Sequence, residues 1–102
     1  MKIIKNIDER LADTINPENP AKDAVKFRTL FRMVVSNHVS LSGEAALEYV
    51  ELGLKLGVDK PDVELEDAEF KKLKEVVNAN PLKWPNMLIG QLYKKIIDSE
   101  KN

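Results

Sequence analysis

The segment that decides the fold is residues 42–56, S-G-E-A-A-L-E-Y-V-E-L-G-L-K-L, because it is apolar on nearly every side. On a helix, its charged side chains recur at steps of four, three and four and form one narrow polar stripe, Glu44, Glu48, Glu51 and Lys55. The rest of the circumference is apolar: Ala45, Ala46, Leu47, Tyr49, Val50, Leu52, Leu54 and Leu56. We therefore predict a helix at 43–56 that three other helices enclose. The second possibility is a self-complementary dimer face.

A first amphipathic helix is predicted just before this segment, at 22–38. Its apolar face carries Ala24, Phe27, Leu30, Phe31, Val34, Val35 and His38. Because the connection to the second helix is short, we expect the two helices to lie antiparallel. The two phenylalanines should then face Ala45, Ala46 and Gly53.

Two further helices are predicted at 67–78 and 85–98. The buried stripe of the third is Phe70, Leu73, Val76 and Val77, and the fourth has two apolar rows formed by Leu88, Ile89, Leu92, Tyr93, Ile96 and Ile97. The two rows of the fourth helix form more apolar surface than one neighbouring helix would cover. Together the segments predict an all-α, compact four-helix fold in a single domain, residues 1–102, with an irregular N-terminal arm at 1–21.

Several residues mark the ends of these helices. Ser42 is a plausible N-cap of the second helix, and Gly57 offers it a left-handed stop. Leu65 and Phe70 are spaced for a hydrophobic staple at the start of the third helix. Pro85 suits the first position of the fourth.

The N-terminal arm has a different residue pattern from the rest of the chain. Residues 2–5 could form a short edge strand, and Ile7, Leu11 and Ile15 recur at a step of four, as on one weak helical stripe. Residues 63–65 alternate apolar and polar and could pair with 2–4 as a two-stranded ribbon. We do not favour that pairing, because an isolated ribbon needs a helix beneath it.

Composition excludes several functional classes. Sixteen Lys and Arg against seventeen Asp and Glu give a net charge of -1, so no overall field attracts nucleic acid or anionic lipid. The chain has no cysteine, which rules out disulfides and thiolate zinc sites. No segment approaches the roughly 20 apolar residues of a membrane span. We expect a cytoplasmic protein without membrane contact.

The order of the segments resembles a group of small, mostly uncharacterised helical proteins of tailed bacteriophages and prophages. The likeness lies in T-L-F-R-M-V-V-S-N-H at 29–38, L-E-Y-V-E-L-G-L-K-L at 47–56, V-E-L-E-D-A-E-F at 63–70 and P-N-M-L-I-G-Q-L-Y-K-K-I-I at 85–97. Relatives in this group often begin with a D-G turn between short strands, which this chain lacks. The resemblance implies a bacterial host cytoplasm and no known activity.

His38 is the only histidine, and its titration near neutral pH would suit an acid, a base or a switch. No cysteine or second histidine accompanies it, so a helix-end or core-edge role with a satisfied hydrogen bond is favoured. The acidic run at 62–69 could hold a hard cation or a pair of catalytic carboxylates, but favourable charge at a helix start accounts for most of it. We expect no metal, no cofactor and no enzymatic activity.

Basic side chains gather on the outer side of the first helix, at Lys22, Lys26, Arg28 and Arg32, and on the third at Lys71, Lys72 and Lys74. Cations at helical spacing suit a phosphate backbone, although a solvated face looks the same. No aromatic residues interleave with them for base stacking. Nucleic-acid or nucleotide binding is therefore the alternative function.

The last connection offers candidate anchors for a protein partner. Trp84 lies between two prolines in N-P-L-K-W-P-N-M at 80–87, with Met87 and Tyr93 nearby. Trp often anchors interfaces, but it also buries most of its area when it caps a core. The sequence thus predicts a small non-enzymatic interaction protein that binds itself or another protein, with Trp84, Met87 and Tyr93 as contact residues.

Overall fold

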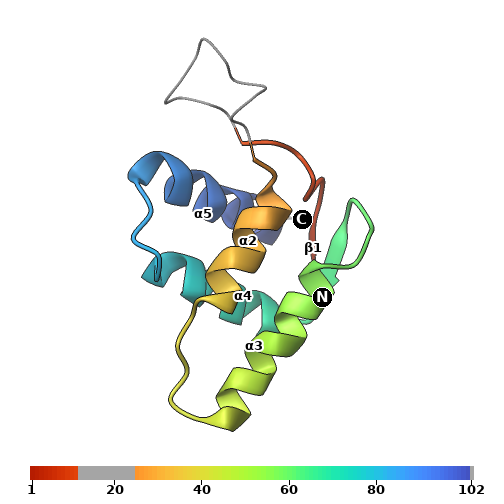
Figure 1. Ribbon diagram of the computed structural model, residues 1–102. Coiled ribbons are helices and arrows are strands. Elements are labelled where there is room, and N and C mark those ends of the chain that lie inside the picture. The colour runs from red at the N-terminus through yellow and green to blue at the C-terminus, as the bar shows by residue number, and fades with distance from the viewer. Residues whose placement is uncertain (12–24, 102) are drawn as a thin grey trace.

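The computed structural model describes residues 1–11 and 25–101. The regular secondary structure of this part of the chain is helical apart from two short strands (Figure 1). In chain order the elements are β1 (Lys2–Ile4), α2 (Phe27–Ser36), α3 (Gly43–Leu56), β2 (Val63–Leu65), α4 (Asp67–Ala79) and α5 (Asn86–Glu100). The predicted all-α fold of four helices is confirmed, and the helices at 43–56, 67–78 and 85–98 begin and end within two residues of the prediction.

The two-stranded ribbon that we did not favour is present. β1 and β2 pair antiparallel, with Lys2 opposite Leu65 and Ile4 opposite Val63. The ribbon is not isolated, because α5 packs against β1 while α3 and α4 pack against β2. Ile4 and Leu65 are both fully buried. The helical support that a lone ribbon lacks thus comes from α3 and α4, which flank β2, and from α5, which is far from β1 in the sequence.

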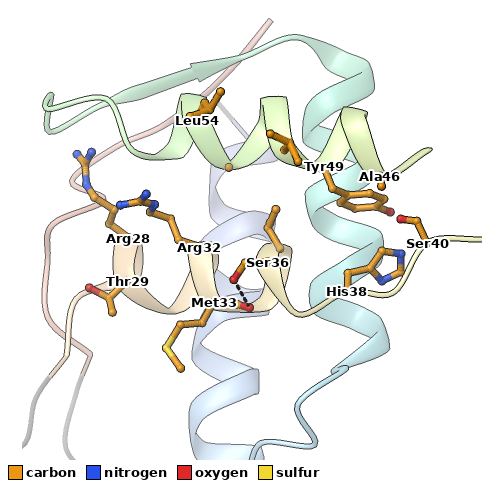
Figure 2. A pocket seen from close by; sticks show the side chains of 13 residues that line it. Arg28, Thr29, Arg32, Met33, Ser36, His38, Ser40, Ala46, Tyr49 and Leu54 are labelled. Atoms are coloured by element: carbon orange, nitrogen blue, oxygen red, sulfur yellow. Dashed lines mark hydrogen bonds between the residues drawn. The ribbon is translucent and has the colours of Figure 1, made fainter. Parts of the chain in front are cut away.

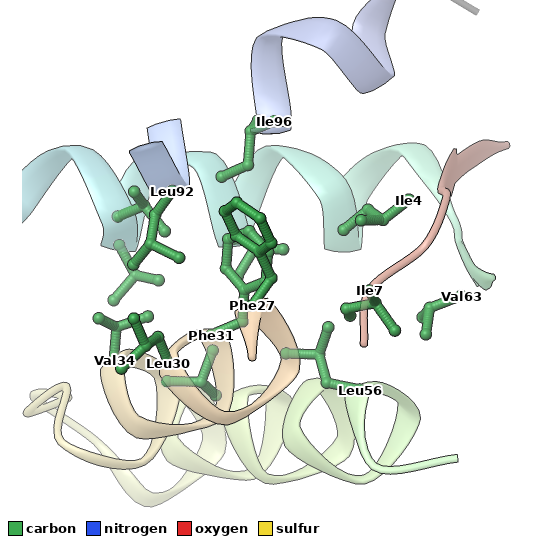
Figure 3. Close-up of a cluster of buried hydrophobic side chains, with 14 of the residues drawn as sticks. Ile4, Ile7, Phe27, Leu30, Phe31, Val34, Leu56, Val63, Leu92 and Ile96 are labelled. Carbon is green, nitrogen blue, oxygen red and sulfur yellow. The ribbon is translucent and has the colours of Figure 1, made fainter. Parts of the chain in front are cut away.

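The core lies where α2, α4, α5 and the ribbon meet (Figure 3). Phe31, Leu73, Leu92 and Ile96 are each fully buried in it. Phe27 and Phe31 point into this core towards Ile96 (Figure 3), and not towards Ala45 and Ala46 as expected. The contact between α2 and α3 is made instead at Val35, whose Cγ1 lies 3.8 Å from an ideal Cβ on Gly53.

The N-terminal arm folds differently from the predicted helical stripe. Residues 5–8 form a turn, and Arg10 makes an isolated antiparallel bridge with Lys26. Ile7 and Leu11 are buried nevertheless, whereas Ile15 lies outside the described residues. The bridge holds residues 25 and 26 extended, through a hydrogen bond from the Leu11 N–H to the Val25 carbonyl (2.8 Å). For this reason α2 begins at Phe27, and the predicted start at residue 22 falls outside the described part.

The prediction that other helices enclose α3 is wrong. Only Leu52 and Leu56 of this helix are buried, while Leu47, Val50 and Leu54 are 57%, 57% and 68% exposed. The helix lies at the edge of the molecule with its N-terminal end projecting (Figure 1). A chain of this size has too few helices left to cover its outer face.

Local signals at the helix ends were mostly correct. Ser42 Oγ accepts a hydrogen bond from the Ala45 N–H (3.1 Å), as an N-cap should. Glu66 and Glu69 form a capping box at the start of α4. The left-handed stop at Gly57 is wrong: its φ is -87°, and the positive φ falls on Asn80 at the end of α4 instead. Pro85 precedes α5 as its N-cap.

Candidate functional site

A groove with a volume of about 680 Å³ lies between α2 and α3 (Figure 2). Val35 of α2 and Gly53 of α3 both line it and lie within van der Waals contact distance of each other. Met33 lines the groove from α2, and Val50 and Leu54 line it from α3. The lining is therefore mostly apolar, although the groove is open to water.

The groove continues onto an apolar row on the outer face of α3. Leu47, Val50 and Leu54 follow each other at steps of three and four, so they lie along one side of the helix. Beyond the start of α3, Val39 and Leu41 in the preceding loop are 84% and fully exposed. Monomeric proteins usually expose apolar residues singly, so a row of this kind is typical of a contact surface.

Arginine side chains lie at one end of the groove (Figure 2). Arg28 forms a two-pronged ion pair with Asp8, with Nε–Oδ1 at 2.9 Å and Nη2–Oδ2 at 3.1 Å. It also donates to the carbonyls of Leu56, Val58 and Lys60. Its side chain is only 12% exposed, so it serves to tie the arm and the loop after α3 to α2.

Arg32 has a different environment from Arg28. It is exposed, and its guanidinium carbon lies 3.2 Å from an ideal Cβ on Gly57. A side chain at position 57 would therefore displace it, which gives Gly57 a role that is unrelated to backbone handedness. Arg32 forms no ion pair with another described residue, so it is the free cation at this edge of the groove.

His38 lies at the opposite end, packed against Tyr49 of α3. The two ring centroids are 4.4 Å apart, and Lys72 Nζ lies 5.1 Å from the Tyr49 ring centre. His38 is half-buried, in agreement with the predicted core-edge position. Ser40 also faces this end, and its buried hydroxyl has no hydrogen-bond partner among the described residues.

The polar stripe of α3 faces α4 on one side. Glu48 pairs with Lys72 (2.8 Å), and Lys55 pairs with Glu69 (2.7 Å). The hydrogen bond to Glu69 raises the pKa of Lys55, and that to Glu48 raises the pKa of Lys72. The other two members of the stripe, Glu44 and Glu51, are exposed and form no ion pair within the described part of the chain.

The predicted basic face is not continuous. Arg28 is turned inward, Lys26 is exposed, and Lys22 lies outside the described residues. On α4, Lys72 is bound to Glu48 and Lys74 to Glu100 (2.6 Å), which leaves Lys71 exposed. Binding of nucleic acid through this face stays a prediction, with Arg32 and Lys26 as its described cations.

The acidic run at 62–69 is engaged in structural contacts. Asp62 accepts a hydrogen bond from the Asn6 N–H (3.0 Å), and Asp67 pairs with the N-terminal amine (3.0 Å). Glu66 and Glu69 cap α4. Among the described residues, no group of three or more His, Asp or Glu side chains is placed to hold a metal ion.

The predicted anchors at the last connection lie apart from the groove. Trp84 is half-buried against the core, and Asn80 holds its backbone through bonds to its N–H (2.9 Å) and its carbonyl (3.0 Å). Tyr93 also packs against the core, and Met87 is 46% exposed. Neither Trp84, Met87 nor Tyr93 lines the groove between α2 and α3.

The sequence pointed to a contact surface on α3 only through the second possibility, a self-complementary dimer face, and it did not single out the exposed row. The signal was the apolar character of residues 42–56 on nearly every side, which we assigned first to the core. Leu47, Val50 and Leu54 recur at helical spacing, as buried Leu52 and Leu56 do. The two sets differ only in the side of the helix that they occupy. Sequence alone does not define which side faces the core.

Comparisons with protein-family models, with curated proteins and with solved structures gave no match to this chain. The phage resemblance therefore stays a prediction from the sequence. No helix in the described residues is both long and apolar enough to cross a bilayer.

Proposed function

We propose that this protein is a small, non-enzymatic interaction module whose contact surface is the outer face of α3 together with the groove beside α2. The single observation that carries the proposal is the exposure of Leu47, Val50 and Leu54 in one row, each by more than half of its surface. Removing such a row from water is favourable by roughly 25 cal/mol per Å² of apolar area. A binding partner would supply the cover that the rest of the chain does not.

The features of the groove support protein binding over chemistry. Its His38 packs against Tyr49 with the two rings tilted, and no acid or nucleophile is bonded to it within the described part. Outside the groove, the loop residues Val39 and Leu41 are also exposed, so exposed apolar side chains are not confined to a pocket for a small molecule. An elongated apolar surface with charged edges is the usual geometry of helix recognition. We place this activity in the cytoplasm of a bacterial host, as the sequence resemblance implies.

Site-specific photo-crosslinking in bacterial cells tests the proposal. Benzoylphenylalanine at position 50 should yield a discrete adduct, either with a second copy or with another protein. The same probe at position 75, which is exposed on α4, should yield none. The adduct should disappear when Leu47 and Leu54 are both changed to Gln. Equal labelling at both positions, or a lack of adducts at position 50, would contradict the proposed surface.

A further inference from the structure

Two polar side chains without partners lie at opposite ends of the groove between α2 and α3 (Figure 2). At one end, the Arg32 guanidinium forms no ion pair with another described residue. At the other end, Ser40 Oγ is the one buried side-chain polar atom of the described residues that has no hydrogen-bond partner. Leaving a buried hydroxyl unpaired is unfavourable, so a ligand that bonds to it gains more than one that bonds to an exposed group.

The groove between these two ends is apolar. Met33 and Val35 line it from α2, and Val50 and Leu54 line it from α3. Ser36 also lines it, but its hydroxyl already donates to the Met33 carbonyl (3.2 Å). A ligand in the groove therefore meets hydrocarbon along its middle and polar groups at its two ends.

The Arg32 guanidinium is placed at its end of the groove by the lack of a side chain at Gly57. Its carbon lies 3.2 Å and its Nη2 3.4 Å from the position that a Cβ of residue 57 would occupy. Arg28, one turn earlier, uses its own guanidinium to bind Asp8 and three carbonyls. The donors of Arg32 remain available to an anion, and a planar guanidinium matches a carboxylate through two parallel hydrogen bonds.

The length of the groove sets the size of its ligand. On α3 the lining runs from Ala46 to Leu54, which is about 12 Å at the rise of a helix. With C–C bonds of about 1.5 Å, an extended chain of roughly ten carbons has this length. An extended peptide would bring amide groups into the apolar middle, where they lack partners, whereas an alkyl chain has no polar group to satisfy there.

We infer that the groove between α2 and α3 binds an aliphatic carboxylate of about ten carbons, with its head group paired to Arg32 and its far end beside Ser40. The volume of about 680 Å³ lies in the range of small-molecule sites. The inference goes beyond the proposed function, because it gives the groove a small ligand of its own. Leu47 does not line the groove, so this part of the exposed row stays available to a protein.

Decanoate has the head group and the chain length that the site requires, and it can be titrated into the whole protein. Isothermal titration calorimetry should show saturable binding of one decanoate per chain. Decyltrimethylammonium, with the same chain and a cationic head, should bind at least about tenfold more weakly. Equal binding of the two, or no saturable binding of decanoate, overturns the inference. Binding to phosphatidylglycerol vesicles in place of monomeric decanoate indicates a lipid surface and overturns it as well.

Three variants test the head-group contact. Arg32→Gln should weaken decanoate binding about tenfold. Gly57→Ala keeps the charge, but its added Cβ displaces the guanidinium, so it should also weaken binding. Lys71→Gln removes one charge at an exposed position of α4 and should leave binding unchanged. Equal losses in Arg32→Gln and Lys71→Gln, or no loss in Arg32→Gln, overturn the assignment of the head group.

The far end of the ligand is tested with 10-hydroxydecanoate. Its terminal hydroxyl can bond to Ser40 Oγ, so it should bind about threefold more tightly than decanoate. This gain should vanish in Ser40→Ala; a gain that persists there overturns the inferred orientation. Photo-crosslinking at position 50 tests the proposed function separately. If decanoate does not bind while position 50 still crosslinks to a protein, the inference fails and the proposed function stands.

Discussion

At the residue scale, two arginines one turn apart on α2 have opposite roles. Arg28 is mostly buried and joins Asp8 to three carbonyls at the end of α3 and in the loop after it, whereas Arg32 is exposed over Gly57. Both were predicted as members of one solvated basic face. The partners of Arg28 come from segments about 20 and 30 residues away in the sequence, so helical spacing did not distinguish it from Arg32.

Arg28→Met should lower the free energy of unfolding by about 2 kcal/mol, because it leaves Asp8 and the loop carbonyls without their donor. The value lies below that of a fully buried pair because the Asp8 side chain is 39% exposed. Lys26→Met removes an exposed cation just before the start of α2. It should change the free energy of unfolding by less than about 0.5 kcal/mol. Urea denaturation of both variants measures the difference; equal effects would show that Arg28 is not a structural tie.

Glu69 should make the stability of the protein depend on pH in the acidic range. Partial burial tends to raise its pKa, but hydrogen bonds from Lys55 and from the Glu66 N–H outweigh this and lower it. Because the folded-state pKa is below the unfolded one, the stabilisation is present above the unfolded pKa. It is lost as the pH falls through the folded pKa.

Two substitutions at this position separate charge from capping. Glu69→Gln keeps an acceptor for the capping box but removes the charge, so its stability should decline less steeply with acid than that of the wild type. Glu69→Ala removes both contributions and should cost about 1 kcal/mol at neutral pH. Thermal denaturation from neutral to acidic pH measures both. Parallel pH profiles for wild type and Glu69→Gln would contradict the assignment.

At the scale of the element, α3 is a helix with two apolar sides, only one of which belongs to the core. Its bounds and its Ser42 cap could be predicted from sequence, because they depend on local hydrogen bonding and on the end of the preceding loop. The burial of its individual side chains could not be predicted in this way. Leu52 at 1% exposure and Leu54 at 68% have the same side chain, and only the positions of α2, α4 and β2 make them different.

This difference predicts contrasting behaviour of two leucine variants. Leu52→Ala should lower the free energy of unfolding by about 3 kcal/mol at any protein concentration, because it opens a cavity in the core. Leu54→Ala should change the free energy of unfolding of the isolated protein by less than about 0.5 kcal/mol, because this side chain is already exposed to water. Urea denaturation of dilute protein distinguishes the two. A loss of about 3 kcal/mol for Leu54→Ala in dilute solution would place that side chain in the core.

At the scale of the whole molecule, the ribbon joins the beginning of the chain to its middle and its end. Lys2 Nζ donates to the Glu100 carbonyl (3.3 Å), the N-terminal amine pairs with Asp67, and α5 packs on β1. The four helices could be predicted because each is amphipathic on its own. The ribbon was disfavoured because its stability depends on α5, which is about 90 residues away and leaves no mark on the local pattern.

With α2, α4, α5 and the ribbon enclosing the core, the outer face of α3 is left over, and the central claim is that a protein partner covers it. Photo-crosslinking from position 50 in bacterial cells tests this claim most directly. The account predicts a discrete adduct that is heavier than the chain mass of 11.6 kDa. The Leu47→Gln, Leu54→Gln double variant should form no adduct, although its far-UV circular dichroism spectrum should be unchanged. A lack of adducts from position 50 in the wild-type background would contradict the claim.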